Sequence, residues 1–278
     1  MDAMTLRLAS LRLAPVQCAS WGHPETSGLP TIDYFLSSEL MEPPDADGQY
    51  CEKLILLPNV SIYYEPLDIS EVTVDRISLG LRPKSILFHC CQSLFKFLPQ
   101  YDDVFPRIAQ RVGDCQFVFT SYPNIKPVID TFRMRLDKAF DRFHLKMDDH
   151  VVLLPFLDGS RFHALNRLSD IYLDSISWSG CNSAFEAIAC NLPIVTLPGT
   201  LLRNRMCHAI LTMMGVKETI ASSVDDFIDL AVRLGKDPAW RQQISNKISV
   251  NKHLAYRDET CIDALEDFLE TVVREKLQ

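Results

Sequence analysis

The chain has 278 residues, of which 47% are hydrophobic and 23% are charged, so it can bury a substantial globular core. A net charge of -8 without clustered basic residues argues against a nucleic-acid-binding surface. The nine cysteines show neither a C-x-x-C pair nor metal-ligand spacing, which indicates reduced thiols and no metal site. Because the chain has no run of 18 apolar residues and no signal peptide, we expect a cytoplasmic protein that does not bind membranes.

The first 60 residues alternate short apolar runs with turn-forming segments. A helix is predicted over residues 3–13, stopping before Pro15. Strands are predicted over residues 14–19, 32–36 and 53–57. The loop 22–28 is dense in turn formers and carries His23. Loop residues often carry function, so His23 is a candidate for chemistry, and a solvated turn histidine is the alternative.

Strands and helices alternate from residue 85 to residue 167, after a predicted hinge over residues 67–83. Strands are predicted over residues 85–90, 115–120 and 151–155. Helices are predicted over residues 101–112, 124–143 and 161–167. Lys96 lies in the turn after the first strand, where a lysine can pair with a phosphate as a point charge. An ordinary surface lysine is the alternative.

The stretch 170–198 is the most informative part of the chain. It predicts a buried strand, a polar turn, a short helix and a second strand, which is one unit of a parallel α/β sheet. Ser183 and Glu186 match a capping box. Glu186 either only caps its helix or binds a ribose diol at a cleft, where Cys181, Asn182 and Ser183 would offer backbone N–H groups to a pyrophosphate.

The remaining C-terminal residues are predicted to be helical. A helix over residues 201–214 carries Arg203 and Arg205. Ser223 and the Asp237-Pro238 pair begin further helices with a capping side chain and a proline in the first turn. The chain has neither a G-x-G-x-x-G fingerprint nor a Walker loop, which disfavours a dehydrogenase or a P-loop enzyme.

Two motifs in this chain resemble the O-GlcNAc transferase/SPINDLY group of GT-B glycosyltransferases. Residues 180–186 and 191–199 are similar to that group's Gly-His-Thr-Thr-Gly-x-Asp turn and its Gly-x-Pro-x-Val-Thr-x-Pro-Gly segment. Cys181 replaces the histidine of the family and Glu186 replaces the aspartate. Glutamate is common at this position across GT-B enzymes, so the resemblance implies a divergent donor site.

The second motif is the loop 22–28, which resembles the family's Gly-Tyr/His-Pro-x-Thr-Ser-Gly. It lies between family-like segments at residues 12–17 and at Asp33-Tyr34. The resemblance implies that Gly22, His23 and Pro24 face the donor sugar, and it extends from about Arg12 to the C-terminus.

Further family positions match less closely. The family places a glutamine and a lysine on the base and the β-phosphate, which suggests Gln92 and Lys96, although these lie four residues apart instead of three. A histidine and an arginine of the next family helix suggest His163 and Arg167, in a register that differs by one. A plain amphipathic helix is the alternative there. Arg205 also matches a family arginine.

The resemblance implies an α/β fold, with a Rossmann-like C-terminal lobe of a GT-B glycosyltransferase over residues 84–278 and a truncated N-terminal lobe over residues 1–66. It implies inverting, metal-independent transfer of a sugar, most of all GlcNAc, from a UDP-sugar to Ser or Thr hydroxyls of a protein acceptor, without a cofactor. His23 and Lys96 are then the catalytic candidates.

Several alternatives stay open. The chain could instead be a nucleotide-binding regulatory module without turnover, or a transferase that uses UDP-glucose or GDP-fucose. A GT-B epimerase fits the donor site but not the loop 22–28. Because only about 65 residues precede the second lobe, and the family's helical repeats and early histidine have no counterpart, we expect a fragment that turns over poorly.

Overall fold

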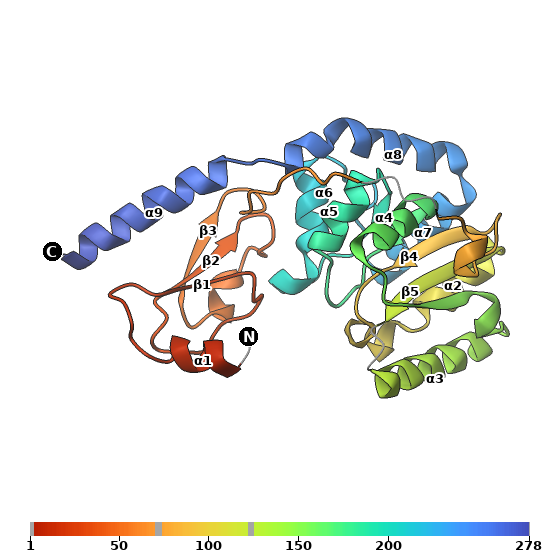
Figure 1. The fold of residues 1–278 in the computed structure, drawn as a ribbon, viewed down its shortest axis with the longest axis horizontal. Helices are drawn as coiled ribbons and strands as arrows, with labels where there is room; N and C mark the ends of the chain where they lie inside the picture. The colour runs from red at the N-terminus through yellow and green to blue at the C-terminus, as the bar shows by residue number, and fades with distance from the viewer. Residues whose placement is uncertain (1–2, 70–73, 122–124, 278) are drawn as a thin grey trace.

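The computed structural model describes residues 3–69, 74–121 and 125–277, and within these ranges the chain forms two parallel sheets (Figure 1). The N-terminal sheet has the order β1-β2-β3, with β1 (Cys18–Ser20), β2 (Tyr34–Ser38) and β3 (Lys53–Leu57). The second sheet has the order β6-β5-β4-β7-β8. Its strands are β4 (Ile86–Cys90), β5 (Cys115–Ser121), β6 (Val151–Pro155), β7 (Ile171–Leu173) and β8 (Ile194–Val195).

The strand order of the second sheet positions the site. The chain begins in the middle at β4, moves outward through β5 to β6, and then returns to the other side of β4 with β7 and β8. The connections therefore reverse direction between β4 and β7. Ligands of open α/β sheets bind beyond the carboxyl ends of the strands at such a switch point, so the segments after Cys90 and Leu173 are expected to line a site.

Helices cover both faces of this sheet. They are α2 (Val104–Val112), α3 (Lys126–Arg142), α4 (Gly159–Leu168), α5 (Asn182–Ala189), α6 (Met206–Met213), α7 (Val224–Lys236) and α8 (Pro238–Asn251). Alternate residues of β4 point to opposite faces: Leu87 joins the cluster that includes Leu165 of α4, and Phe88 joins the larger core that includes Phe105 of α2. Because both faces are covered, β4, β7 and β8 are almost continuously buried, whereas the edge strand β6 is buried at only two of its five residues.

The larger core also includes residues that lie before the second sheet in the sequence. Met41 and Val60 are fully buried in it, and the ring of Tyr64 stacks on Phe185 of α5 with centroids 4.0 Å apart. The last helix, α9 (Thr260–Leu277), returns to the N-terminal sheet, where Phe268 meets the ring of Tyr34 edge to face at 5.1 Å. A helix from the C-terminal end of the chain thus packs against the N-terminal sheet.

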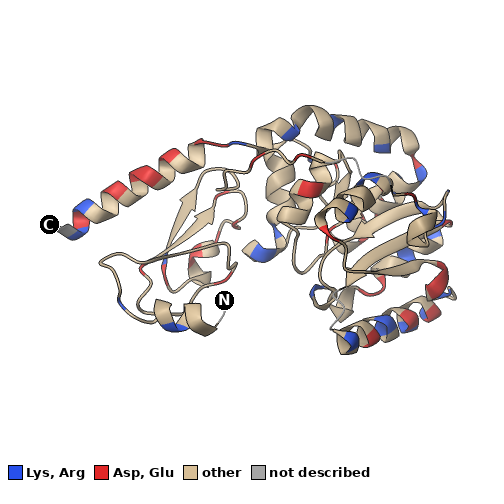
Figure 2. Ribbon diagram, in the orientation of Figure 1, with Lys and Arg blue, Asp and Glu red and all other residues tan. Residues whose placement is uncertain are grey.

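The outer helices of the N-terminal part are more exposed. Helix α1 (Ala3–Ala9) buries none of its residues, and α9 extends away from the second sheet with a row of acidic residues along it (Figures 1 and 2). In the described ranges, no helix combines the length and the apolar character that crossing a bilayer requires.

Most predicted elements are present, and several of their bounds are wrong. The predicted helix 3–13 ends at Ala9, the strand 14–19 begins only at Cys18, and the helix 201–214 is divided into a 3-10 turn (Leu202–Asn204) and α6. The predicted start of α3 at Asn124 lies outside the described residues, as does part of the predicted hinge, residues 70–73. The division into lobes 1–66 and 84–278 stays a prediction.

Candidate functional site

A buried carboxylate shapes the turn that follows β7. Asp174 is 4% exposed, and it accepts hydrogen bonds from Ser179 Oγ at 2.6 Å, Gly180 N at 2.9 Å and Thr196 Oγ1 at 2.7 Å. Burial raises the pKa of Asp174 above its ordinary value, and the hydrogen bonds from Ser179, Gly180 and Thr196 oppose this rise. The carboxylate of Asp174 therefore bonds to the far end of the turn that it begins, at Ser179 and Gly180.

Gly180 brings this turn against the segment after β4. A Cβ atom at position 180 would lie 2.3 Å from the hydroxyl oxygen of Tyr172, 2.5 Å from Ser183 Oγ and 2.7 Å from Gln92 Nε2. Real Cβ contacts are not this short, so only glycine permits the approach. The glycine therefore allows a cluster of polar side chains to close around it.

That cluster joins residues from both sides of the switch point. Gln92 Nε2 donates to Ser183 Oγ at 2.6 Å, and the hydroxyl of Tyr172 lies 3.0 Å from the same Oγ. Lys96 Nζ donates to Gln92 Oε1 at 3.0 Å. Burial lowers the pKa of Lys96. The structure thus brings three predicted site residues, Gln92, Lys96 and Ser183, into one hydrogen-bonded group.

Helix α5 begins beside this cluster without the predicted capping box. Its N-cap residue is Cys181, whose side chain makes no capping hydrogen bond, while Ser183 Oγ is engaged with Gln92 and Tyr172. The capping-box prediction is therefore wrong. The first N–H groups of a helix have no acceptor within the helix, so those of Asn182 and Ser183 can serve an anion. Burial raises the pKa of Cys181 to about 12, so its thiol is uncharged at neutral pH.

Glu186 faces a histidine of α4. His163 Nε2 lies 3.4 Å from Glu186 Oε1, and both side chains are largely buried. Burial raises the pKa of Glu186, and the neighbouring His163 opposes this rise. Arg167, one helical turn further on, is not brought to this group. Arg167 is exposed, and with Asp170 and Pro193 it lines a hollow of about 330 Å³. Asp170 and Pro193 directly precede β7 and β8, so this hollow lies at the amino ends of the strands.

The loop 22–28 is anchored to its own sheet. Thr26 Oγ1 and Ser27 N donate to the carboxylate of Glu52 at 2.6 and 2.7 Å. Burial acts to raise the pKa of Glu52, but the hydrogen bonds from Ser27 and Thr26 prevail and lower it. These bonds fix the loop in which Gly22, His23 and Pro24 lie.

The loop's three candidate residues face two different hollows. Pro24 lines a hollow of about 200 Å³ with Leu201 and Leu202, which follow the second sheet. Gly22 and His23 line another, of about 410 Å³, which includes residues of α1 but neither Lys96 nor Glu186. The structure therefore directs Pro24, but not His23, toward the second sheet.

Arg205 connects the two parts of the chain. Its Nε donates to the carbonyl of Met41 at 2.9 Å, and its Nη1 donates to the carbonyl of Gly199 at 3.1 Å. Burial lowers the pKa of Arg205. These contacts join the segment after β2 to the loop after β8, so Arg205 has a structural role in this arrangement.

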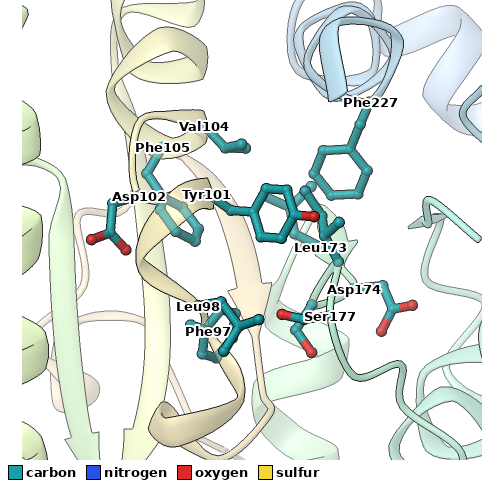
Figure 3. A pocket seen from close by; sticks show the side chains of 12 residues that line it. Phe97, Leu98, Tyr101, Asp102, Val104, Phe105, Leu173, Asp174, Ser177 and Phe227 are labelled. Atoms are coloured by element: carbon teal, nitrogen blue, oxygen red, sulfur yellow. The ribbon is translucent and has the colours of Figure 1, made fainter. Parts of the chain in front are cut away.

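Two hollows lie near the polar cluster. The one in Figure 3 is enclosed by apolar and aromatic side chains, among them Tyr101, Phe105 and Phe227, with Asp174 nearby, and its volume of about 20 Å³ has room for a single water. The other has about 120 Å³ and lies at the carboxyl ends of β4, β5 and β6, where Cys91, Thr120 and Phe162 line it. The second is the larger of the two, and Cys91 and Ser93, the chain neighbours of Gln92, line it.

Sequence analysis missed Asp174 and Trp178. An acidic residue directly after a buried strand and six residues before a glycine was a usable signal for Asp174. Trp178 is a single aromatic residue in a turn of serines, and its ring centre lies 5.2 Å from Lys96 Nζ and 5.5 Å from Arg203 Cζ. Both distances lie within the range of cation–π contact.

Curated plant proteins are similar to this chain in sequence. The chain is 28% identical over 227 residues to the probable UDP-N-acetylglucosamine–peptide N-acetylglucosaminyltransferase SPINDLY of Arabidopsis thaliana, over 81% of this chain and 24% of that protein. It is 21% identical over 250 residues to the probable transferase SEC of the same plant, over 87% of this chain and 25% of that protein. The chain thus spans about a quarter of the length of these curated relatives.

Solved structures agree in fold. A point mutant of the Thermobaculum terrenum O-GlcNAc transferase matches with a TM-score of 0.77 at 21% identity, over 95% of this chain and 49% of that chain. Sucrose-phosphate synthase of Thermosynechococcus elongatus matches with a TM-score of 0.59 at 13% identity, over 87% of this chain and 59% of that chain. The predicted α/β fold of GT-B type and the O-GlcNAc transferase-like resemblance are confirmed. Since glycosyl transferase family 41 matches residues 64–258, which contain the whole polar cluster, the chain belongs to that family.

Proposed function

We propose that this chain binds a nucleotide sugar and forms the donor side of a protein O-glycosyltransferase. The donor we propose is UDP-GlcNAc, the acceptor is a Ser or Thr hydroxyl of a protein, and the transfer is inverting and metal-independent. The observation that carries this proposal is the group of Gln92, Lys96 and Ser183 at the switch point of the second sheet. The names of the plant relatives support the choice of donor and acceptor.

The leaving diphosphate explains the choice of residues. As the bond to the sugar breaks, negative charge develops on the diphosphate, and groups already aimed at it stabilise the transition state. Lys96 supplies a half-buried cation, and the first N–H groups of α5 at Asn182 and Ser183 supply a partial positive charge. Together they perform the role that a divalent cation performs in other transferases.

The other donor contacts follow from position. Gln92 lies between Cys91 and Ser93, which line the hollow of about 120 Å³, and is proposed to contact the base. Glu186 is proposed to accept hydrogen bonds from the ribose diol, with His163 holding one of its oxygens. Cys181 adds a neutral thiol and its backbone N–H.

The acceptor side is proposed with the N-terminal sheet. Gly22, His23 and Pro24 would face the sugar, and His23 would exchange the proton of the acceptor hydroxyl, a task that histidine side chains commonly perform in general acid–base catalysis. We further propose two lobes, residues 1–66 and 84–278, joined by a hinge over residues 67–83. The alternative is a nucleotide-binding module without turnover.

UDP should bind, and the substitution Lys96→Met should weaken that binding about tenfold, because one charge-assisted contact to phosphate is lost. Isothermal titration calorimetry of the purified chain with UDP measures the effect. Lys138→Met on the exposed face of α3 is the matched control and should bind as the wild type does. Absence of heat with both UDP and GDP at millimolar concentration would refute the proposed donor site, and heat with GDP alone would change the proposed donor.

We expect sugar transfer by this chain alone to be slow, because His23 lines a hollow that contains neither Lys96 nor Glu186. Positioning of reacting groups contributes up to about 7–11 kcal/mol to catalysis, and most of this contribution is lost if the groups do not meet. A radiolabelled UDP-GlcNAc assay with cell lysate as the acceptor tests this. Fast transfer that disappears in His23→Ala would contradict the expected slow transfer. Binding of the nucleotide sugar without transfer would favour a nucleotide-binding module without turnover.

A further inference from the structure

We propose that Arg203 is a second cation of the diphosphate site and that Glu25 neutralises it until a nucleotide binds. This inference rests on the proposed nucleotide binding and adds three residues to it: Arg203, Glu25 and Trp178. Trp178 is the side chain that holds the two cations in one place.

The two cations share one aromatic ring. Lys96 Nζ lies 5.2 Å from the centre of the Trp178 ring, and Arg203 Cζ lies 5.5 Å from it. The face of an indole ring carries partial negative charge, which attracts both groups. Trp178 therefore contacts two positive charges, one from Lys96 and one from Arg203.

The backbone fixes the same arrangement. The residues on either side of Trp178 each bond to one of the two cationic residues: Ser177 Oγ donates to the carbonyl of Lys96 at 3.0 Å, and Ser179 N donates to the carbonyl of Arg203 at 2.8 Å. The turn that positions Ser179 and Gly180 is the one held by Asp174. One turn thus bonds to the backbone of both Lys96 and Arg203.

Glu25 of the loop 22–28 forms an ion pair with Arg203 across the two parts of the chain. The pair is partly open to water, with 31% of the Arg203 side chain and 47% of the Glu25 side chain exposed. Ion pairs exposed in this way are weak, so an anion with more charge can displace the carboxylate. A guanidinium also matches the geometry of phosphate oxygens, to which it can donate two parallel hydrogen bonds.

This exchange would connect nucleotide binding to the N-terminal loop. When a diphosphate takes Arg203, Glu25 loses its partner, and the loop that carries His23 and Pro24 loses its ion pair to the second sheet. Glu25 stands at the position that the family motif of this loop leaves unspecified. The proposed exchange thus depends on a side chain that the family motif does not fix.

The test measures the affinities of UDP, uridine and inorganic pyrophosphate by calorimetry. We expect Glu25→Gln to bind UDP and pyrophosphate about three- to tenfold more tightly, because Arg203 no longer has an internal anion to exchange. Arg203→Gln should bind them about tenfold more weakly, and the double variant should equal Arg203→Gln alone. Uridine, which lacks phosphate, should be unaffected by all three substitutions.

Glu65→Gln is the matched control, because it also removes one exposed carboxylate from an ion pair, here with Arg257. If Glu25→Gln and Glu65→Gln bind UDP equally, the role of Glu25 is refuted while nucleotide binding stands. If pyrophosphate binds in an Arg203-dependent way and UDP binds no more tightly than pyrophosphate, the anion site stands and the proposed nucleotide function is refuted. If neither UDP nor pyrophosphate binds, both proposals are overturned.

Discussion

Replacing Gly180 by alanine should reduce UDP affinity at least about tenfold and lower the free energy of unfolding by about 1–3 kcal/mol, as overpacking of a filled site does. The added methyl group would meet the Tyr172 hydroxyl at 2.3 Å, Ser183 Oγ at 2.5 Å and Gln92 Nε2 at 2.7 Å. Gln92 would have to leave Ser183, and Lys96, which is bonded to Gln92, would move with it.

Calorimetry with UDP and urea unfolding of the same variant measure both effects. Gly159→Ala is the matched control, because a Cβ atom at Gly159 would have open space around it, in the first turn of α4. It should leave UDP binding and stability nearly unchanged. A Gly180→Ala variant that binds UDP as tightly as the wild type would mean that the cluster is not the donor site.

The fold was largely predictable because its signals are local. Short continuous apolar runs indicate strands, so the strands Lys53–Leu57 and Val151–Pro155 have the predicted bounds, although neither is buried along its whole length. The helix start at Ser223 was also correct, since its side chain accepts a hydrogen bond from Asp226 N. The helix 201–214 was not predicted correctly. Asn204, whose side chain bonds back to Leu201 N, closes a separate turn before α6 begins.

The candidate site was only partly predictable, because it depends on contacts between distant segments. Gln92 and Lys96 lie where the order of strands places them, although their spacing differs from the family pattern. Ser183 matched a local capping motif, yet its hydroxyl is engaged by Gln92, which lies 91 residues earlier in the chain. No local pattern in the sequence could have revealed that competition.

Contacts between distant segments also explain why the positions of Arg167 and Trp178 were not predicted. Arg167 was selected by its place in a helix, but the direction of α4 carries it to the opposite edge of the sheet. Trp178 was overlooked because its importance comes from Lys96 and Arg203, which reach it from two other segments. Residue type and spacing thus selected residues that lie together at the carboxyl ends of the strands, such as Gln92, Lys96 and Ser183, and their partners required the three-dimensional structure.

Replacing Asp174 by alanine should have the largest effect on stability, a loss of about 3–5 kcal/mol, because each buried donor left without an acceptor costs about 1–3 kcal/mol. The donors are Ser179 Oγ, Gly180 N and Thr196 Oγ1, which lie 2.6 to 2.9 Å from the carboxylate. Loss of these three hydrogen bonds would release the turn that carries Trp178, so the affinity for UDP should fall as well. Urea unfolding and calorimetry measure the two effects.

The pH dependence distinguishes the carboxylate from a merely space-filling side chain. Because burial raises the pKa of Asp174 in the folded state, its contribution to stability is fully present below the ordinary value of 3.8 and declines as the pH rises through the raised folded value. Asp174→Asn should remove this part of the pH dependence, and it should still destabilise at pH 7, because its amide hydrogens would point at donors. Asp225→Asn, which alters an exposed carboxylate on α7, is the control. If Asp174→Asn were as stable as this control at pH 7, the turn would not depend on having two acceptor oxygens at Asp174, and its geometry would have to come from packing and its other hydrogen bonds.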